Sequence, residues 1–192
     1  MDSKLSRDDA WSLLCKYTKS DSLLKHALAV EGVMKHFTKL LDEKDIDKWG
    51  IVGLLHDLDY EMYPDEHCIK VQEIMKAHNI SDEYIHAVAS HGYGICCNIE
   101  PIHKMEKVLY TIDELTGLIS AAAIMRPSKS ILDLELKSVK KKYKSKGFAS
   151  GVDRSIIENG AKMLDLELDF VIKETIEGMK TVAEDIGLKG DI

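Results

Sequence analysis

Apolar residues recur along most of this chain at the three- and four-residue spacing of one face of an α-helix. Ser6 can cap a first helix that runs to about Tyr17, and Asp21 can cap a second helix whose apolar positions form a single stripe. A third helix starts near Asp45 and runs through WGIVGLLHDL. It is apolar on nearly every side, which predicts that it is buried in the core.

The same spacing continues through the rest of the chain, interrupted at Pro64 and stopped at Pro127, where proline cannot continue a helix. Further helices are expected over residues 65–78, 81–91, 103–125, 131–145, 153–163 and 168–187. No internal repeat and no sustained alternation of apolar and polar residues is present. The pattern therefore predicts an all-α protein, a single-domain bundle of about nine helices.

The composition agrees with a globular helical domain. Of the 192 residues, 45% are hydrophobic and 31% charged, with only 12 Gly and 3 Pro, which argues against disorder and against a turn-rich β fold. A net charge of −7 gives the whole molecule no general attraction to duplex nucleic acid or to an anionic membrane. No stretch approaches the roughly 20 apolar residues of a spanning helix, and the N-terminal residues lack the apolar core of a secretory signal. We expect a cytoplasmic protein, and the sequence leaves its oligomeric state open.

The cysteines predict free thiols. Cys15, Cys68, Cys96 and Cys97 include no C-x-x-C pair, and adjacent cysteines bridge each other only with strain. We therefore expect buried or half-buried thiols in a reducing compartment, and neither a disulfide framework nor a zinc-thiolate site.

Histidines and carboxylates on apolar helix faces supply the candidate chemistry. His26 flanks the stripe of the second helix, His56 and Asp57 end the buried third helix, and Asp113 lies among apolar residues of the helix at 103–125. An ionised aspartate in such surroundings is costly unless it is paired or bound to metal. A lone histidine there is more often a core residue, but one divalent ion would compensate all four groups together. Imidazole and carboxylate ligands favour iron, manganese, cobalt, nickel or zinc over calcium, with magnesium as a further candidate.

The order of these residues, H…HD…D, resembles the HD superfamily of metal-dependent phosphohydrolases. The segments HALAV, GLLHDLDYE and EKVLYTIDELTG each resemble a ligand-bearing segment of that family, and the likeness covers residues 20–120. It implies one HD-type domain over 1–192, with a metal-binding core at 20–120 and helices at 126–188 packed on it. It also implies a hydrolase in which a metal-activated water cleaves a phosphomonoester or phosphodiester of a small nucleotide-like or anionic metabolite.

The resemblance further implies one or two metal ions. Several family members bind a second ion through two more histidines, and DEHCIKVQEIM and AVASHGYG resemble the segments that carry them, pointing to His67 and His91 with Asp57 as the bridge. His86 competes with His91, but five residues turn a helix by about 140°, so one straight helix cannot aim both at one ion. The likeness of AVASHGYG to the family segment favours His91 as the ligand, with His86 as a neighbour of the ligands or on the surface. The histidines that lie beside lysines or polar residues are expected to be solvated: His36, His78 and His103.

The chain departs from the family pattern in two places. The common continuation of the HD pair is Ile-Gly-Lys, whereas residues 58–60 are Leu-Asp-Tyr, so the lysine that could touch a phosphate is absent. His91 is followed by glycine and lacks the doubled histidine of the cyclic-dinucleotide phosphodiesterases, which argues against such substrates. Asp59 and Glu61 are candidate catalytic residues beside Asp57 that could orient a ligand or the water. They could equally cap the helix end or face solvent.

A basic segment in the last third could replace the missing lysine. Residues 126–146 hold eight basic side chains against two acidic ones in a chain whose total charge is −7. Arg126 and Lys129 could reach a substrate phosphate, and Lys137, Lys140 and Lys141 could extend that patch. The alternative is a solvated helix face. A small patch on an acidic protein fits a phosphorylated metabolite better than duplex nucleic acid, and DELTG…RPSK…KSVKKK resembles an HD subfamily with no assigned substrate.

Two other classes of function remain open beside hydrolysis. One is a regulatory HD module that binds a nucleotide without turnover, which tight binding with no phosphate release would reveal. The other is a di-iron oxygenase on the same helical scaffold, which oxygen consumption would reveal. The complete ligand set favours the hydrolase, although a fold alone is a weak argument for function.

Overall fold

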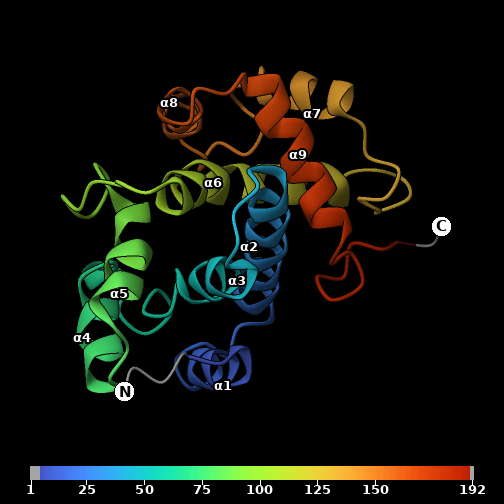
Figure 1. Cartoon of the computed structure of the whole chain (residues 1–192). Coiled ribbons are helices and arrows are strands. Elements are labelled where there is room, and N and C mark those ends of the chain that lie inside the picture. The colour runs from blue at the N-terminus through green and yellow to red at the C-terminus, as the bar shows by residue number, and fades with distance from the viewer. Residues whose placement is uncertain (1–4, 191–192) are drawn as a thin grey trace.

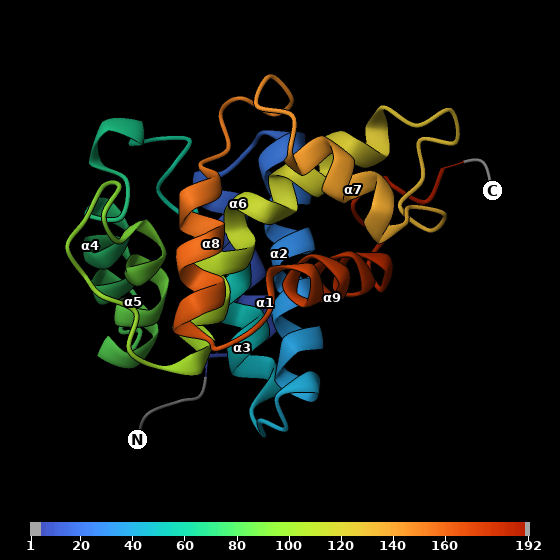
Figure 2. The same ribbon diagram turned by 90° about the horizontal axis from the view of Figure 1, so that it is seen from above.

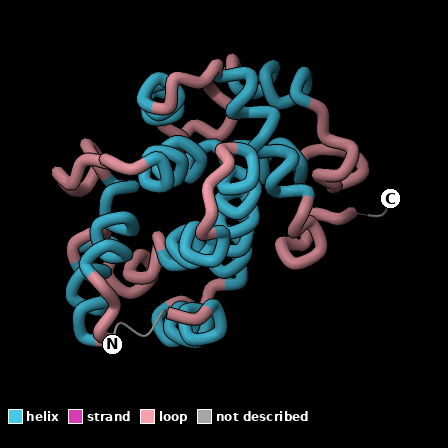
Figure 3. Tube along the Cα trace, in the orientation of Figure 1, coloured by secondary structure: helices cyan, strands magenta, loops and turns pink. Residues whose placement is uncertain are grey.

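The computed structural model describes residues 5–190, in which the regular elements are helices joined by turns (Figure 1). They are α1 (Arg7–Tyr17), α2 (Asp21–Leu40), α3 (Ile46–Leu55), α4 (Lys70–Ala77), α5 (Asp82–Ala89), α6 (Lys104–Ile124), α7 (Leu136–Tyr143), α8 (Arg154–Met163) and α9 (Leu168–Lys180), with short 3-10 turns at Pro64–Glu66 and Ser90–Gly92. The described residues form no β-strand, only an isolated bridge between Tyr93 and Cys97 (Figure 3). The prediction of an all-α domain of about nine helices is confirmed.

Helix starts follow the capping signals closely. The Ser6 side chain accepts a hydrogen bond from the backbone N–H of Asp9, and the Asp45 side chain accepts one from Lys48. Both therefore cap as predicted, because their oxygens satisfy amides that the first helical turn leaves free. At α2 the cap is Ser20, and Asp21 is already the first helical residue.

Several predicted helices are shorter in the structure. The expected helix at 65–78 begins only at α4, because Cys68 adopts a left-handed backbone (φ 64°) that ends the preceding turn. The expected helix at 131–145 begins only at α7. Upstream of it the backbone N–H of Ile131 bonds to the carbonyl of Leu188, which ties this segment to the C-terminal end of the chain. α9 ends at Lys180, before the expected end at 187.

The first and last thirds of the chain share one apolar core around α2. Figure 1 shows α2 near the middle of the molecule, with α3 beside it and α4 and α5 to one side. In the same view α9 crosses α2. Figure 2 shows α8 lying along α6. The helices after Pro127 therefore pack on the helices that carry the candidate ligands. No helix within the described range is both long and apolar enough to cross a membrane.

A glycine sets the distance between the first two ligand-bearing helices. A Cβ added to Gly53 would lie 2.8 Å from the Cγ of Met34 and 3.1 Å from the backbone oxygen of Val30, both on α2. Only a residue without a side chain allows this approach of backbone to backbone. The end of α3 thus reaches the face of α2 that carries His26.

Candidate metal centre

Four predicted ligands meet at one point. His26 comes from α2, His56 and Asp57 from the end of α3, and Asp113 from α6. His26 Nε2 lies 3.2 Å from His56 Nε2 and 2.9 Å from Asp113 Oδ1, and His56 Nε2 lies 3.3 Å from both Asp113 Oδ1 and Asp57 Oδ2. Residues 87 positions apart in sequence are therefore in contact through their metal-ligating atoms.

A second group of ligand atoms adjoins the first. His67 Nε2 and His91 Nε2 are 3.1 Å apart, and they lie 3.5 Å and 3.6 Å from Asp57 Oδ1. The two carboxylate oxygens of Asp57 therefore face different groups, Oδ2 the first and Oδ1 the second. This is the arrangement of a carboxylate that can bridge two ions.

The spacings within both groups match the edges of a coordination shell. With metal-to-ligand distances of about 2.1 Å, neighbouring ligands are about 3.0 Å apart in an octahedron and about 3.4 Å apart in a tetrahedron. The distances above run from 2.9 to 3.6 Å, with His26 Nε2 to Asp57 Oδ2 longer at 3.9 Å. Each group could thus hold a metal ion without rearrangement of the backbone.

Hydrogen bonds to the other ring nitrogen orient three of the histidines. His56 Nδ1 lies 2.8 Å from the backbone oxygen of Gly53, and His91 Nδ1 lies 2.6 Å from that of Val88. Because carbonyl oxygens only accept, both Nδ1 atoms must carry the proton, and the Nε2 lone pairs are free to bind a metal. Asp59 likewise holds a proton on His67 Nδ1, so His67 Nε2 and His91 Nε2, which are 3.1 Å apart, are both acceptors with no donor between them unless a cation lies there.

The electrostatics of the cluster favour positive charge at its centre. Burial opposes protonation of His56, but the charges of Asp57 and Asp113 outweigh it and raise the pKa of this imidazole well above its usual range. Burial would likewise raise the pKa of Asp57, yet the neighbouring His56 lowers it well below its usual range. Carboxylates that stay ionised beside buried imidazoles provide the charge that a divalent ion requires.

Asp59 orients His67 of the second group through Nδ1, the ring nitrogen that does not face Asp57. Its side chain is fully buried, with Oδ1 2.7 Å from His67 Nδ1 and Oδ2 accepting a 2.7 Å hydrogen bond from the backbone N–H of Val71. The carboxylate holds the Nδ1 proton of His67 and so turns its Nε2 toward Asp57. Asp59 is thus a positioning residue that does not itself reach the ligand cluster.

Glu61 does not lie at the position that the catalytic role considered from the sequence requires. Its Oε2 accepts hydrogen bonds from the backbone N–H groups of Lys19 (2.7 Å) and Ser20 (3.0 Å), just before α2. These bonds from Ser20 and Lys19 lower the pKa of Glu61. The residue ties the turn after α3 to the start of the helix that carries His26, which differs from the cap at the end of the third helix considered from the sequence.

We expect Glu61→Ala to lower the midpoint of thermal unfolding by a few degrees and to leave the metal content unchanged. Because the folded-state pKa is lowered, the stabilisation is present above the ordinary pKa of glutamate and is lost as the pH falls below it. Thermal unfolding of both proteins at neutral and acidic pH measures this, and the difference between them should shrink in acid. Glu73→Ala, which removes an exposed glutamate paired with Lys70, is the control. Loss of metal in Glu61→Ala would contradict the assignment.

Cys68 lies close enough to His67 and His91 to be a further possible ligand of the second group, but its position relative to the ring of His91 argues against that role. Its sulfur is buried and lies 3.9 Å from His91 Nδ1 and 3.8 Å from His91 Nε2. Because these two distances are nearly equal, the sulfur does not lie on the Nε2 side of the ring. A ligand of the same ion would lie on that side, beyond Nε2. Cys68 thus packs on the ring of His91. All four cysteines are free, as predicted.

The ligand atoms open into a cavity of about 450 Å³, within the size range of small-molecule sites. Its wall also includes side chains that the sequence did not single out, among them Leu23, Tyr60, Ile95, Glu114 and Val152. No protein-family model matches the chain, and no solved structure is significantly similar to it. The site must therefore be interpreted from its own geometry, and membership of the HD superfamily stays a prediction.

Glu114 is the acidic residue of this wall that the sequence reasoning missed. Burial, and after it the charge of Asp113, raises its pKa to about 7. A carboxyl group with such a pKa can take up or release a proton near neutral pH. The signal in the sequence was only its position next to Asp113, which on a helix does not by itself indicate a shared cavity.

The basic segment does not meet the metal centre. Arg126 follows the end of α6, 13 residues or roughly 20 Å along the helix from Asp113. It forms an ion pair with Asp133 (2.7 Å), and the hydroxyl of Ser128 also donates to that carboxylate. Lys129 is likewise absent from the cavity wall among the described residues.

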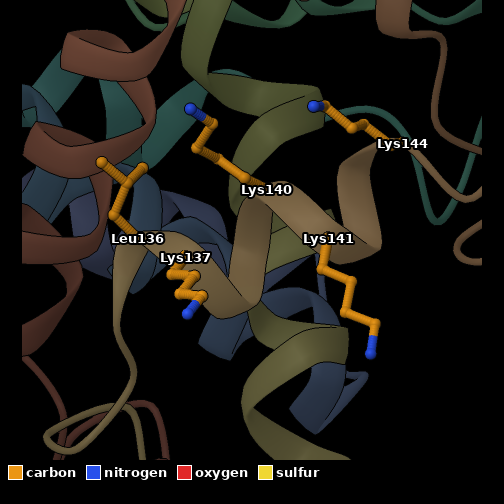
Figure 4. Close-up of a pocket in the computed structure, with 5 residues that line it drawn as sticks. All are labelled: Leu136, Lys137, Lys140, Lys141 and Lys144. Carbon is orange, nitrogen blue, oxygen red and sulfur yellow. The ribbon is translucent and has the colours of Figure 1, made fainter.

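The lysines of α7 line a different surface depression, formed by Leu136, Lys137, Lys140, Lys141 and Lys144. Figure 4 shows the four lysine side chains leaving in different directions instead of converging on one point, and Lys140 forms an ion pair with Asp169. The solvated-face alternative describes this segment better than the phosphate site that the sequence suggested. Charge counting located the patch correctly but carries no information on its distance from the ligands.

The other histidines lie outside the cluster. His86 Nδ1 is 2.9 Å from Glu106 Oε1, so this competitor of His91 is engaged elsewhere. His36 is not simply solvated, because its Nε2 lies 2.8 Å from Glu174 Oε2. His78 bonds to the backbone of its own helix end, and His103 precedes α6 as its N-cap.

Proposed function

We propose that this protein is a metal-dependent phosphohydrolase of the HD type, with a binuclear centre. The observation that carries the proposal is the pair of adjoining ligand groups that share the carboxylate of Asp57, with His26, His56 and Asp113 on one side and His67 and His91 on the other. Four imidazoles and two carboxylates suit iron, manganese, cobalt, nickel or zinc, and exclude calcium on ligand type.

The chain's own residues would prepare this centre for hydrolysis. Two divalent ions in such a centre lower the pKa of a water molecule and neutralise charge on phosphoryl oxygens. Asp59 keeps His67 in the tautomer that binds through Nε2, and the carbonyls of Gly53 and Val88 do the same for His56 and His91. Since no backbone rearrangement is needed, the ligands are preorganised, which is where most of the catalytic advantage arises.

The cavity supports a small substrate. Its volume of about 450 Å³ accommodates a phosphorylated metabolite but no duplex, and the acidic ligands offer no surface to a nucleic acid backbone. Phosphomonoesters and phosphodiesters both remain candidates, because a ligand set fixes the metal and says little about the leaving group.

The test is the metal content of the purified chain together with phosphate release. We expect about two ions per chain in the wild type, about one in His67→Ala, and a protein unable to hold the first ion in His56→Ala. His86→Ala is the matched control, since this histidine is bonded to Glu106 and should leave both ions in place.

Activity is then measured with p-nitrophenyl phosphate and bis(p-nitrophenyl) phosphate, which separate monoesterase from diesterase. A fully loaded protein that hydrolyses neither compound nor any nucleotide, yet binds nucleotides tightly, would replace the hydrolase by the regulatory module. Oxygen consumption by the iron-loaded protein would replace it by the oxygenase. Two ions retained per chain in His56→Ala would contradict the centre itself.

A further inference from the structure

The cavity above the ligand cluster has an unusual wall for a phosphate-binding site. Within the described chain, its lining contains no lysine and no arginine. Apart from the histidines, every charged side chain in it is acidic: Asp57, Asp113 and Glu114. The remaining lining residues are apolar, small or aromatic: Leu23, Tyr60, Gly92, Ile95, Cys96, Gly117, Gly151 and Val152.

Two large side chains stand exposed at the mouth of this cavity. Tyr60 is 45% exposed and Ile95 is 58% exposed, although isoleucine is among the side chains that a folded protein most often buries. The ring of Tyr60 is held edge-on to the ring of His67, with 5.2 Å between centroids and 84° between planes. Exposed apolar groups that line a cavity generally contact its ligand, and an aromatic ring favours a flat partner.

The charges of the site set a limit on the substrate. One phosphate group can be neutralised by the metal ions, but a second anionic group would find no lysine or arginine in the described wall to pair with. Two of the cations considered from the sequence as phosphate contacts are paired elsewhere, Arg126 with Asp133 and Lys140 with Asp169. The wall therefore discriminates against polyanions and in favour of uncharged organic groups.

We propose that the substrate carries a single phosphate group on an uncharged, apolar or aromatic moiety, which packs against Tyr60 and Ile95. Di- and triphosphates, bisphosphates and phosphorylated carboxylic acids are disfavoured. This inference rests on the proposed phosphohydrolase function and specifies its substrate class. Because binding alone can test it, it can fail while the hydrolase survives.

The experiment measures the dissociation constants of three non-hydrolysable phosphonates for the manganese-loaded protein by calorimetry. Phenylphosphonate has one anionic group and an apolar ring, methylphosphonate lacks the ring, and 3-phosphonopropionate adds a carboxylate. We expect phenylphosphonate to bind about tenfold more tightly than either of the others. The C–P bond of a phosphonate is not hydrolysed, so differences in leaving-group reactivity do not affect the comparison.

Substitutions at the mouth of the cavity test whether its side chains cause the preference for phenylphosphonate. Ile95→Ser should weaken phenylphosphonate about fivefold and leave methylphosphonate unchanged. Ile102→Ser is the matched control, because Ile102 is 64% exposed and does not line the cavity, and it should change neither constant. The metal content of both variants should equal that of the wild type, since neither side chain belongs to the ligand cluster.

Equal or tighter binding of 3-phosphonopropionate would overturn the proposal, as would equal effects of Ile95→Ser and Ile102→Ser. If phosphate esters are hydrolysed but phenylphosphonate binds no more tightly than methylphosphonate, the substrate class is wrong and the hydrolase stands. If neither binding nor hydrolysis occurs in the loaded protein, both proposals fall.

Discussion

Asp57→Ala is expected to remove both metal ions and to lower kcat/KM for a phosphate ester by about three orders of magnitude. The reason is the position of this carboxylate, whose Oδ2 lies 3.3 Å from His56 Nε2 while Oδ1 lies 3.5 Å from His67 Nε2. Without it each group loses a ligand, and four imidazoles remain close together with only Asp113 to balance a cation. The charge stabilisation that the ions supply would disappear with them.

Metal analysis and steady-state kinetics on the same preparation measure this result. Asp169→Ala is the control, because it removes an exposed carboxylate whose partner is Lys140 on a different surface. Circular dichroism distinguishes loss of metal from loss of fold, and the variant should remain helical. An Asp57→Ala protein that retained one ion would show that the two groups do not share this ligand, and unchanged turnover without metal would refute the mechanism.

Gly160→Val is expected to lower the free energy of unfolding by about 3 kcal/mol. Gly160 lies where α8 crosses α6, and a Cβ there would overlap the hydroxyl of Thr111 and lie 2.7 Å from its Cβ and 2.9 Å from its Cα. The Cβ and Cα of Thr111 are fixed by the course of the backbone, so a change of rotamer cannot relieve their overlap with the added Cβ. Separation of the two helices would also displace the loop at Gly151 and Val152 from the mouth of the cavity.

Urea unfolding of the wild type and the variant measures the loss. Gly117→Ala is the matched control for stability, because it lies within α6 and an added Cβ would meet nothing within 4 Å. There the substitution should stabilise the protein by about 0.5–1 kcal/mol, since alanine favours the helix. A Gly160→Val protein as stable as the wild type would mean that α8 does not rest on α6 in solution.

The candidate metal ligands could be predicted from local sequence. His56 and Asp57 end a helix that is apolar on nearly every side, and Asp113 lies on an apolar face, so each is costly unless compensated. Helical periodicity fixes which way such side chains point, and that is why their meeting could be expected. Helix geometry excluded only that His86 and His91 bind one ion together; the choice of His91 followed from the family resemblance, and the structure brings His91 to Asp57.

The roles of residues in turns could not be predicted in this way. Asp59 and Glu61 are two positions apart after the same helix, yet one lies buried behind His67 and the other bonds to the start of α2. Their directions depend on the course of the turn, for which periodicity gives no rule. The contribution of Val152 to the cavity arises from the packing of α8 on α6, a contact between distant segments with no local signal.

The wide separation of the ligands in the chain has a consequence for folding. A metal ion bound by His26 and Asp113 would close a loop between positions 87 residues apart, as a disulfide does, but reversibly. Opening of α6 away from α2 would then require release of the ion, so amide exchange in these helices should slow when metal is added. Metal supply would set the lifetime of the folded chain in the cell as well as its activity.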